Sequence, residues 1–439
     1  MEAIRNLDPL GISFCVQLTD FVFKWHKMSI SLYLIYISVL LFALYDAVLG
    51  VRPSIRASKR PPQNSMAEDV VPSHGSAPLA RKCFTETTKS IKIPVWPVWG
   101  GVFAQLAEWM GATAVSESIL RSVGGRVIPI TLGEAELSPF LLLAHHMHSF
   151  TPFDPTRQIV NAIQPEGFPA HPHAGFSTVT ITIEGGLRHR DSSGESSSYG
   201  DGDVQFMNAG AGIVHEEMWD VAPPGRETHQ RIEIYQVWVN SPLDKKFLPS
   251  QTHLLSAADV VAVPVEGGEI KLISGDLQVN GREYTSEGSS YLLSRCCIAT
   301  MSLPKGVSVD IEASRGDSCA MYIRTGSAVA YPSDAPALPG DLVKFSPGGG
   351  EEGERTVFEV QAGDRGLEAL LLIGEPLREP ALMRGPFVQA SEEAFARAAQ
   401  PFQLLGGDLF WDHTIKDAQW KEHIARYNLP RVIEQLSQY

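Results

Sequence analysis

The chain has 439 residues, of which 44% are apolar and 20% are charged, as in a globular protein rather than a disordered chain or a multi-span membrane protein. The 36 basic and 50 acidic residues give a net charge of −14, which disfavours direct binding to nucleic acid. The five cysteines show no CxxC spacing, so neither a disulfide framework nor a cysteine-rich zinc site is expected. At about 150 residues per domain, the length predicts two or three folded units.

The N-terminal region differs in composition from the rest of the chain. Residues 28–45 are 18 consecutive residues without a charge, three of them serines. As a helix with a rise of about 1.5 Å per residue they would extend roughly 27 Å, close to the thickness of a bilayer core. We therefore predict that residues 1–65 form a membrane-inserting or targeting extension, with residues 28–45 as the tether. If translation begins at Met66 instead, the expected location is the cytoplasm or the nucleus.

A linker is predicted next, because residues 52–93 are rich in Pro, Ser, Lys and Arg and show little apolar pattern. Apolar residues at helical spacing then predict a short helix over residues 102–110. We assign residues 66–115 to this linker and helix.

Short alternating runs separated by glycine-containing turns dominate residues 116–375. The clearest run is 176–184, where Val179 and Ile181 face one way and Thr180 and Thr182 the other. Many short strands of this kind indicate antiparallel sandwiches or barrels, and the length is sufficient for two. Similar turn-plus-acid segments at 201–204 (DGDV) and 340–343 (GDLV) suggest a duplicated β-domain. We place the two domains at 116–245 and 246–390.

Two helices are predicted near the C-terminus. Ser391 is a suitable N-cap and is followed by Glu392 and Glu393, which favours a helix to about residue 399. A second helix is expected over residues 417–426. We assign these helices to a terminal segment, residues 391–439.

Two pairs of potential metal ligands share one spacing. His171 and His173 are two residues apart, so on an extended chain both imidazoles project to the same face. His215 and Glu217 repeat this spacing about forty residues later, while Glu216 should point the opposite way. Three imidazoles and one carboxylate suit Fe, Mn, Ni, Cu or Zn. We predict one divalent transition metal per chain, held by these four residues.

Other histidines offer rival interpretations. His146 and His148 also share a face if their segment is extended, so they form a rival ligand pair; otherwise they are polar residues near a barrel mouth. We predict that His189 is solvated near a turn. The stretch between His253 and His413 contains no histidine, so the second β-domain is expected to be a scaffold.

Three separate motifs carry a resemblance to a known family. Residues 168–194 read FPAHPHAGFSTVTITIEGGLRHRDSSG, residues 201–218 read DGDVQFMNAGAGIVHEEM, and residues 373–393 read IGEPLREPALMRGPFVQASEE. In order and spacing they resemble the pirin family of the cupin superfamily, over roughly residues 115–428. The resemblance implies an all-β fold of two tandem cupin (jelly-roll β-barrel) domains. We expect this fold to be completed by C-terminal helices and an N-terminal hydrophobic extension.

The resemblance also implies a metal site. In the family a single iron lies in the N-terminal barrel, and its ligands correspond to His171, His173, His215 and Glu217. Several members are flavonol dioxygenases, whereas animal pirins are nuclear transcription co-regulators. Three positions depart from the family pattern: Ala174 and Ala211 stand where members commonly have Arg, or in the second case also Thr, and Ser177 stands where Glu is common.

The predicted function is therefore a mononuclear iron protein, with Fe(II) as cofactor, that cleaves quercetin-like flavonols with O₂. Glu217 would bind the metal and accept the substrate hydroxyl proton. The expected partners are a small phenolic substrate and O₂. An alternative is a non-catalytic, iron-dependent redox-sensing protein that binds a protein partner as a transcription co-regulator, and a third interpretation is a structural or storage cupin without activity.

Overall fold

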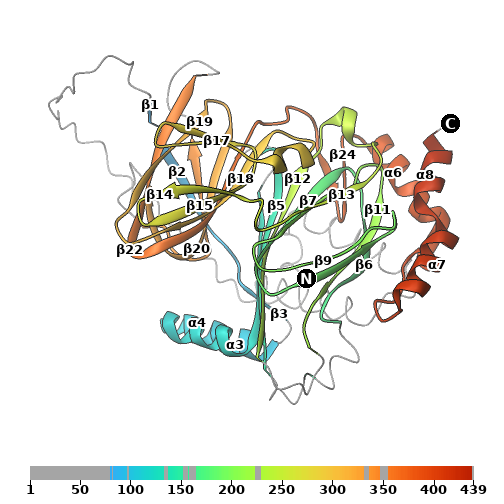
Figure 1. Ribbon diagram of the computed structural model, residues 1–439, viewed down its shortest axis with the longest axis horizontal. Coiled ribbons are helices and arrows are strands. Elements are labelled where there is room, and N and C mark those ends of the chain that lie inside the picture. Colours follow the sequence, from blue (N-terminus) through green and yellow to red (C-terminus); the bar gives the residue numbers. More distant parts are fainter. Residues whose placement is uncertain are drawn as a thin grey trace, which may run out of the picture. The chain divides into compact units, whose positions relative to one another are not determined.

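The computed structural model describes residues 80–81, 83–95, 98–132, 137–151, 157, 165–222, 229–330, 336–346 and 354–437. All of these residues belong to one compact unit, residues 80–439. This unit contains two β-barrels, followed by helices at the C-terminus (Figure 1).

The first barrel has two sheets. The larger sheet has seven strands in the order β13-β10-β7-β12-β5-β4-β3. The smaller sheet has four strands in the order β6-β11-β8-β9. The strands of the larger sheet are β3 (Ile93–Val95), β4 (Gly124–Thr131), β5 (Phe140–Phe150), β7 (Phe176–Glu184), β10 (Val204–Asn208), β12 (Gln230–Asn240) and β13 (Gln251–Leu255). Those of the smaller sheet are β6 (Gly167–His173), β8 (Leu187–Asp191), β9 (Ser196–Tyr199) and β11 (Ile213–Trp219).

The alternation predicted for residues 176–184 is confirmed in β7. Val179 and Ile181 lie in an apolar core together with Ile298 and Leu370 of the second barrel. On the opposite face, the Thr180 hydroxyl donates to Glu217 on β11 of the smaller sheet, with the two oxygens 2.9 Å apart. One face of the larger sheet therefore binds the second barrel, and the other faces a polar barrel interior.

The second barrel is built from one eleven-stranded sheet whose interior is apolar. Its core consists of Val, Ile, Leu, Met, Ala, Cys and Phe side chains, among them Phe358 and Met321, which are both 0% exposed. The strands are β1 (Ala80–Arg81), β2 (Cys83–Lys89), β14 (Val261–Val265), β15 (Gly268–Ser274), β16 (Asp276–Val279), β17 (Arg282–Thr285), β18 (Cys296–Leu303), β19 (Ser308–Ser314), β20 (Ser318–Ala330), β21 (Asp341–Ser346) and β22 (Arg355–Gly374). The predicted all-β fold with two tandem cupin barrels is confirmed.

A buried polar network also joins the two barrels. The His145 ring nitrogens lie 2.8 Å from the Tyr322 hydroxyl and 2.9 Å from Glu233 Oε1. Arg324 of the second barrel donates to both oxygens of Glu233, at 2.7 and 2.8 Å. Burial alone would raise the pKa of Glu233, but its hydrogen bonds with Arg324 and His145 hold that pKa well below its usual value. The pair is therefore an ionised contact in the core of the interface.

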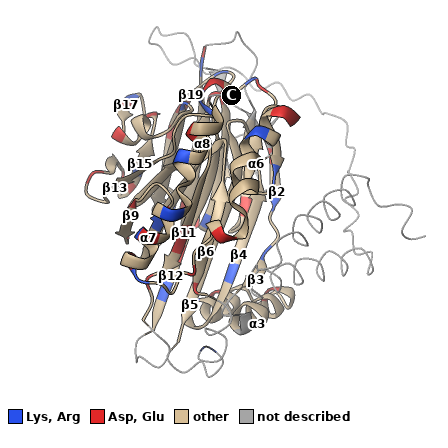
Figure 2. Cartoon of the chain, turned by 90° about the vertical axis from the view of Figure 1, so that its right-hand side faces the viewer, with Lys and Arg blue, Asp and Glu red and all other residues tan. Residues whose placement is uncertain are grey.

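The C-terminal segment lies against the first barrel (Figure 1). It contains β23 (Leu382–Arg384), β24 (Phe387–Gln389), α6 (Glu392–Leu405), α7 (Asp417–Tyr427) and α8 (Leu429–Ser437). The Ser391 side chain accepts a hydrogen bond from the Ala394 backbone N–H, so the predicted N-cap is confirmed. Acidic and basic residues are mixed along these helices (Figure 2).

The linker prediction is wrong over part of its length. Within residues 52–93, Cys83–Lys89 forms β2, which pairs with β21, and Ile93 begins β3. The pairing partner of β2 lies about 250 residues away, so no local sequence pattern could reveal it. Two helices follow, α3 (Val98–Trp109) and α4 (Thr113–Ser122), of which we predicted only the first. The domain boundaries 1–65, 66–115, 116–245, 246–390 and 391–439 stay predictions.

The prediction of membrane or organelle targeting is corrected. In the described part of the chain, every helix is too short or too polar to cross a bilayer. Residues 28–45, on which the prediction depended, lie outside the described residues.

Candidate metal centre

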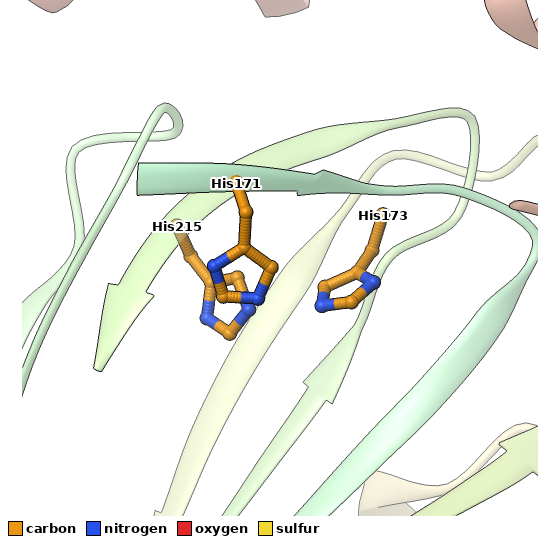
Figure 3. A group of neighbouring side chains, drawn as sticks. All are labelled: His171, His173 and His215. Carbon is orange, nitrogen blue, oxygen red and sulfur yellow. The ribbon is translucent and has the colours of Figure 1, made fainter. Parts of the chain in front are cut away.

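The HPH motif lies in β6, where an extended backbone turns alternate side chains to opposite faces. His171 stands directly opposite His215 in the antiparallel β6–β11 pair. His171 and His173 therefore project from one strand toward the interior, and His215 meets them from the neighbouring strand (Figure 3). We call these three residues the histidine cluster.

The cluster brings three nitrogen donors together. One ligand atom from each of His171, His173 and His215 lies within 4.8 Å of the others, and within the described ranges this is the one group of three or more His, Cys, Asp or Glu residues so arranged. His215 is 0% exposed and His173 is 3% exposed. A metal could reach all three rings from a single position between them.

Burial keeps these imidazoles neutral. Loss of hydration lowers the pKa of His173 well below its usual value, and the neighbouring His171 lowers it further. The pKa of His215 is lowered well below its usual value for the same reason, with contributions from His171, His173 and His189. The pKa of His171 is also lowered by burial, although the Pro169 carbonyl opposes this effect. Neutral imidazole is the form that binds a metal.

Unsatisfied ring nitrogens show that the cluster fits a metal. Both nitrogens of His215, and Nδ1 of His173, are buried without a hydrogen-bond partner in the described part of the chain. Buried polar atoms without a partner are rare and costly in folded proteins. A divalent metal would bind the lone pair of one nitrogen of each ring, and imidazole suits Fe, Cu, Ni and Zn.

Glu217 is not a member of this group: it lies on β11, two residues after His215, where its charge acts on His171 and its carboxylate is held by other side chains. Its Oε1 accepts hydrogen bonds from the hydroxyls of Thr180 and Tyr199, both at 2.9 Å, and its Oε2 accepts one from Gln236 at 2.8 Å. A carboxylate has about four acceptor positions. Three are filled, so one lone pair remains, on Oε2. The sequence offered no signal for Tyr199, whereas the alternation of β7 placed Thr180 inside the barrel.

The neighbouring carboxylate, that of Glu216, attaches β11 to the C-terminal segment. As predicted, Glu216 faces away from the cluster: its Oε1 lies 2.6 Å from Arg190, and its Oε2 accepts a hydrogen bond from the Trp411 indole at 2.7 Å. Arg190 in turn donates to the carbonyl of Ile415. Glu216 thus ties β11 to the C-terminal segment, while Glu217, one residue later, faces the interior.

The C-terminal segment also fixes the end of the ligand strand. Gly175, two residues after His173, has a φ of +84°, and a Cβ there would lie 2.0 Å from the Val388 carbonyl oxygen. The buried Lys246 ammonium donates to the carbonyls of Gly175 and Val388, at 2.7 and 3.2 Å, and to Asn240. The downstream motif at 373–393 therefore braces the backbone that presents the HPH pair.

The prediction for His189 is wrong. Its side chain is 0% exposed, lies in β8, and approaches Asp191 Oδ2 through Nε2 at 3.0 Å. The ring centroid is 5.4 Å from that of His215. The segment RHRD reads as polar, but its alternate residues turn inward, and the spacing of two between His189 and Asp191 was the signal that could have shown it.

The rival pair His146 and His148 is not part of a comparable group. Both lie in β5, and their rings stack at 5.7 Å beside the aromatic rings of Phe168 and Trp219. They are buried rather than placed at a solvated barrel mouth, with 9% and 6% of their surface exposed. The described residues offer them no third ligand of the kind that completes the histidine cluster.

The residues that depart from the family pattern are accommodated locally. Ala174 is 0% exposed and pairs with Phe387, which leaves no space for a longer side chain without rearrangement. Ala211 is buried as well, and the Ser177 hydroxyl donates to Asn208 at 2.5 Å. Ala174 and Ala211 have no polar side-chain atom, and the recorded hydrogen bond of the Ser177 hydroxyl goes to Asn208 and not to the cluster.

Comparison with known proteins identifies the family. The family models for pirin and for the pirin C-terminal cupin domain match residues 125–239 and 298–405. The chain belongs to the pirin family. It is 32% identical to a Pseudomonas aeruginosa protein named "Putative quercetin 2,3-dioxygenase" over 275 residues, which are 62% of this chain and 87% of that protein. It is also 30% identical to rat pirin over 297 residues, 66% of this chain and 87% of the relative.

A solved structure shows the same architecture. A crystal structure titled as quercetin 2,3-dioxygenase from Acinetobacter baumannii has a TM-score of 0.57 and 26% sequence identity, and the match covers 74% of this chain and 98% of that one. A Geobacillus kaustophilus protein, GK1651, has a TM-score of 0.51 at 25% identity, covering 69% of this chain and 99% of that chain. The chain is therefore a pirin with quercetin-dioxygenase-like relatives.

Proposed function

We propose that this protein is a mononuclear iron dioxygenase that cleaves flavonol-type substrates. The observation that carries the proposal is the cluster of three imidazoles, of which the buried His173 and His215 have ring nitrogens without a partner among the described residues, together with the Glu217 carboxylate, which keeps one free lone pair. The relatives named as quercetin 2,3-dioxygenases support the choice of substrate class. The alternative, a non-catalytic redox-sensing co-regulator, receives no comparable support.

The metal would be held by His171, His173 and His215, with Glu217 Oε2 as the fourth ligand. Iron bound there would supply a Lewis acid for a substrate oxygen and a path for electrons to O₂. The protein supplies the preorganisation, because each strand that carries a ligand is fixed by its sheet and by the C-terminal segment. Ligands held in this way need little reorganisation when substrate binds.

Glu217 is the proposed acceptor for the proton of the flavonol 3-hydroxyl. Burial and the negative charge of Glu217 raise the pKa of Tyr199 well above its usual value, so Tyr199 remains a hydroxyl donor. With Oε1 occupied by Tyr199 and Thr180, the one free lone pair of Oε2 would either bind the metal or accept the proton, so the proton transfer requires that Oε2 leaves the metal. Gln236 holds that oxygen in place without filling both of its lone pairs.

The direct test is flavonol-dependent O₂ uptake by the iron-loaded full-length chain, with quercetin as the probe. We expect one O₂ consumed and one carbon monoxide released for each flavonol lost. The His215→Ala variant and the metal-free protein are the matched controls, and both should be inactive. No uptake with Fe, Mn, Ni, Co or Cu, in protein that demonstrably binds the metal, would reject the proposed activity.

A further inference from the structure

A fourth imidazole lies beside the histidine cluster. His189 on β8 stands directly opposite Glu217 in the β8–β11 pair, and residues so paired have Cβ atoms about 5 Å apart. Its ring is 5.4 Å, centroid to centroid, from the ring of His215. It is fully buried. The interior therefore receives side chains from β6, β8 and β11 at one place.

Asp191 holds the His189 ring in one orientation. Asp191 Oδ1 accepts from the Ser193 backbone N–H at 2.8 Å, the Ser193 hydroxyl at 2.5 Å and the Glu195 backbone N–H at 3.2 Å. Its Oδ2 accepts from Thr252 at 3.0 Å and lies 3.0 Å from His189 Nε2. A carboxylate with this many donors is ionised and can only accept. Nε2 of His189 must therefore carry a hydrogen.

This arrangement fixes the chemistry of the other ring nitrogen. With the hydrogen on Nε2, Nδ1 is the ring nitrogen that is left to accept a hydrogen bond. Nδ1 is buried, and nothing in the described residues donates to it. A buried acceptor without a donor costs free energy comparable to a lost hydrogen bond. A molecule with an O–H group, held at the histidine cluster, would supply the missing donor.

We infer that His189 Nδ1 accepts a hydrogen bond from an O–H group held at the histidine cluster, either a water or the acidic hydroxyl of a phenolic substrate. The inference rests on the metal site proposed above and adds a positioning residue to it. Asp191 sets the tautomer, His189 presents the acceptor, and together they orient an oxygen ligand between β8 and β11. A carboxylate that orients an imidazole at a metal site is a recurrent arrangement.

The test uses ¹⁵N-histidine NMR on the full-length chain, with Zn²⁺ as a diamagnetic probe. In the metal-free protein we expect the His189 hydrogen on Nε2, which faces Asp191. On addition of Zn²⁺, the ligand nitrogens of His171, His173 and His215 should shift strongly. His189 Nδ1 should show a smaller upfield shift, as expected for a new hydrogen bond. A further shift on addition of quercetin would identify the donor as its hydroxyl, and no further shift would identify it as water.

The Asp191→Asn variant gives a sharp comparison. Three donors already point at Oδ1, so the amide oxygen should stay there and the NH₂ group should replace Oδ2. His189 Nε2 would then become the acceptor, its hydrogen would move to Nδ1, and the Zn²⁺-induced shift should disappear. Zn²⁺ affinity should fall by about tenfold or less. His146 is the control, because its Nδ1 is also buried without a partner among the described residues but should not respond to Zn²⁺.

Four results would overturn the inference. An Nδ1–H tautomer in the unaltered protein would contradict the proposed acceptor. A His189 Nδ1 signal that is insensitive to Zn²⁺, or that shifts as much as the three cluster nitrogens, would show either no contact or direct ligation. If the cluster histidines themselves fail to respond to Zn²⁺, the metal site is rejected, and this inference falls with it.

Discussion

Two adjacent glutamates on β11 have different roles, one in attaching the C-terminal segment and one in the barrel interior. Glu216 pairs with Arg190 and Trp411 on the outer side, while Glu217 faces the interior with one free lone pair. A strand turns successive side chains to opposite faces, so one residue step separates the two roles. The same alternation on β6 sends His171 and His173 inward, so the shared face of these two histidines could be predicted from their spacing.

Replacing Glu217 by Gln should therefore reduce turnover far more than metal content. The three imidazoles remain to hold the metal, but an amide is a very poor base, and loss of a general base typically costs about 10²–10⁴-fold in rate. The measurement is iron content by elemental analysis together with the rate of quercetin loss. Glu216→Gln is the matched control and should keep its activity wherever it remains folded. Equal activity in the Glu217 variant and the unaltered chain would remove Glu217 from the chemistry.

At the scale of elements, local pattern predicted the strands better than their partners. The period of two identified β7, and the Ser391 N-cap located the start of α6. The N-terminal strand β2 belongs to the second barrel because it pairs with β21. The burial of His189 depends on which face of β8 is covered. Neither the pairing of β2 nor the burial of His189 can be read from a few neighbouring residues in the sequence. The contacts that complete the site are long-range, so they required the structure.

The contacts of Glu216 with the C-terminal segment should stabilise the fold measurably. Glu216→Ala should lower the free energy of unfolding by up to about 3–5 kcal/mol, because it leaves the buried Arg190 with only the exposed Asp417 as a carboxylate partner. Urea denaturation followed by tryptophan fluorescence would measure the change. Glu375→Ala removes an exposed partner of Arg295 and should cost less than about 1 kcal/mol. Similar effects of the two changes would show that Glu216 does not fasten the segment.

For the whole molecule, buried histidines make stability depend on pH. Burial lowers the pKa of His145 and of His146 below the unfolded value of 6.5. Below pH 6.5 the unfolded chain therefore binds more protons than the folded one, and stability falls with decreasing pH until the folded pKa is reached. Each such group contributes up to about 1.4 kcal/mol per pH unit. The urea midpoint of the metal-free protein should drop between pH 7.5 and 5.5, and less so in His146→Phe. A midpoint that stays constant over this range would contradict the assigned burial.

We predict that the first barrel binds one metal through the histidine cluster and that the apolar second barrel binds none. Metal stoichiometry tests it most directly, measured by elemental analysis of the full-length chain after loading with Fe(II) under anaerobic conditions and removal of excess metal. We expect one iron per chain, and loss of most of this iron in the His173→Ala and His215→Ala variants. Two irons per chain, or full occupancy in either variant, would contradict it.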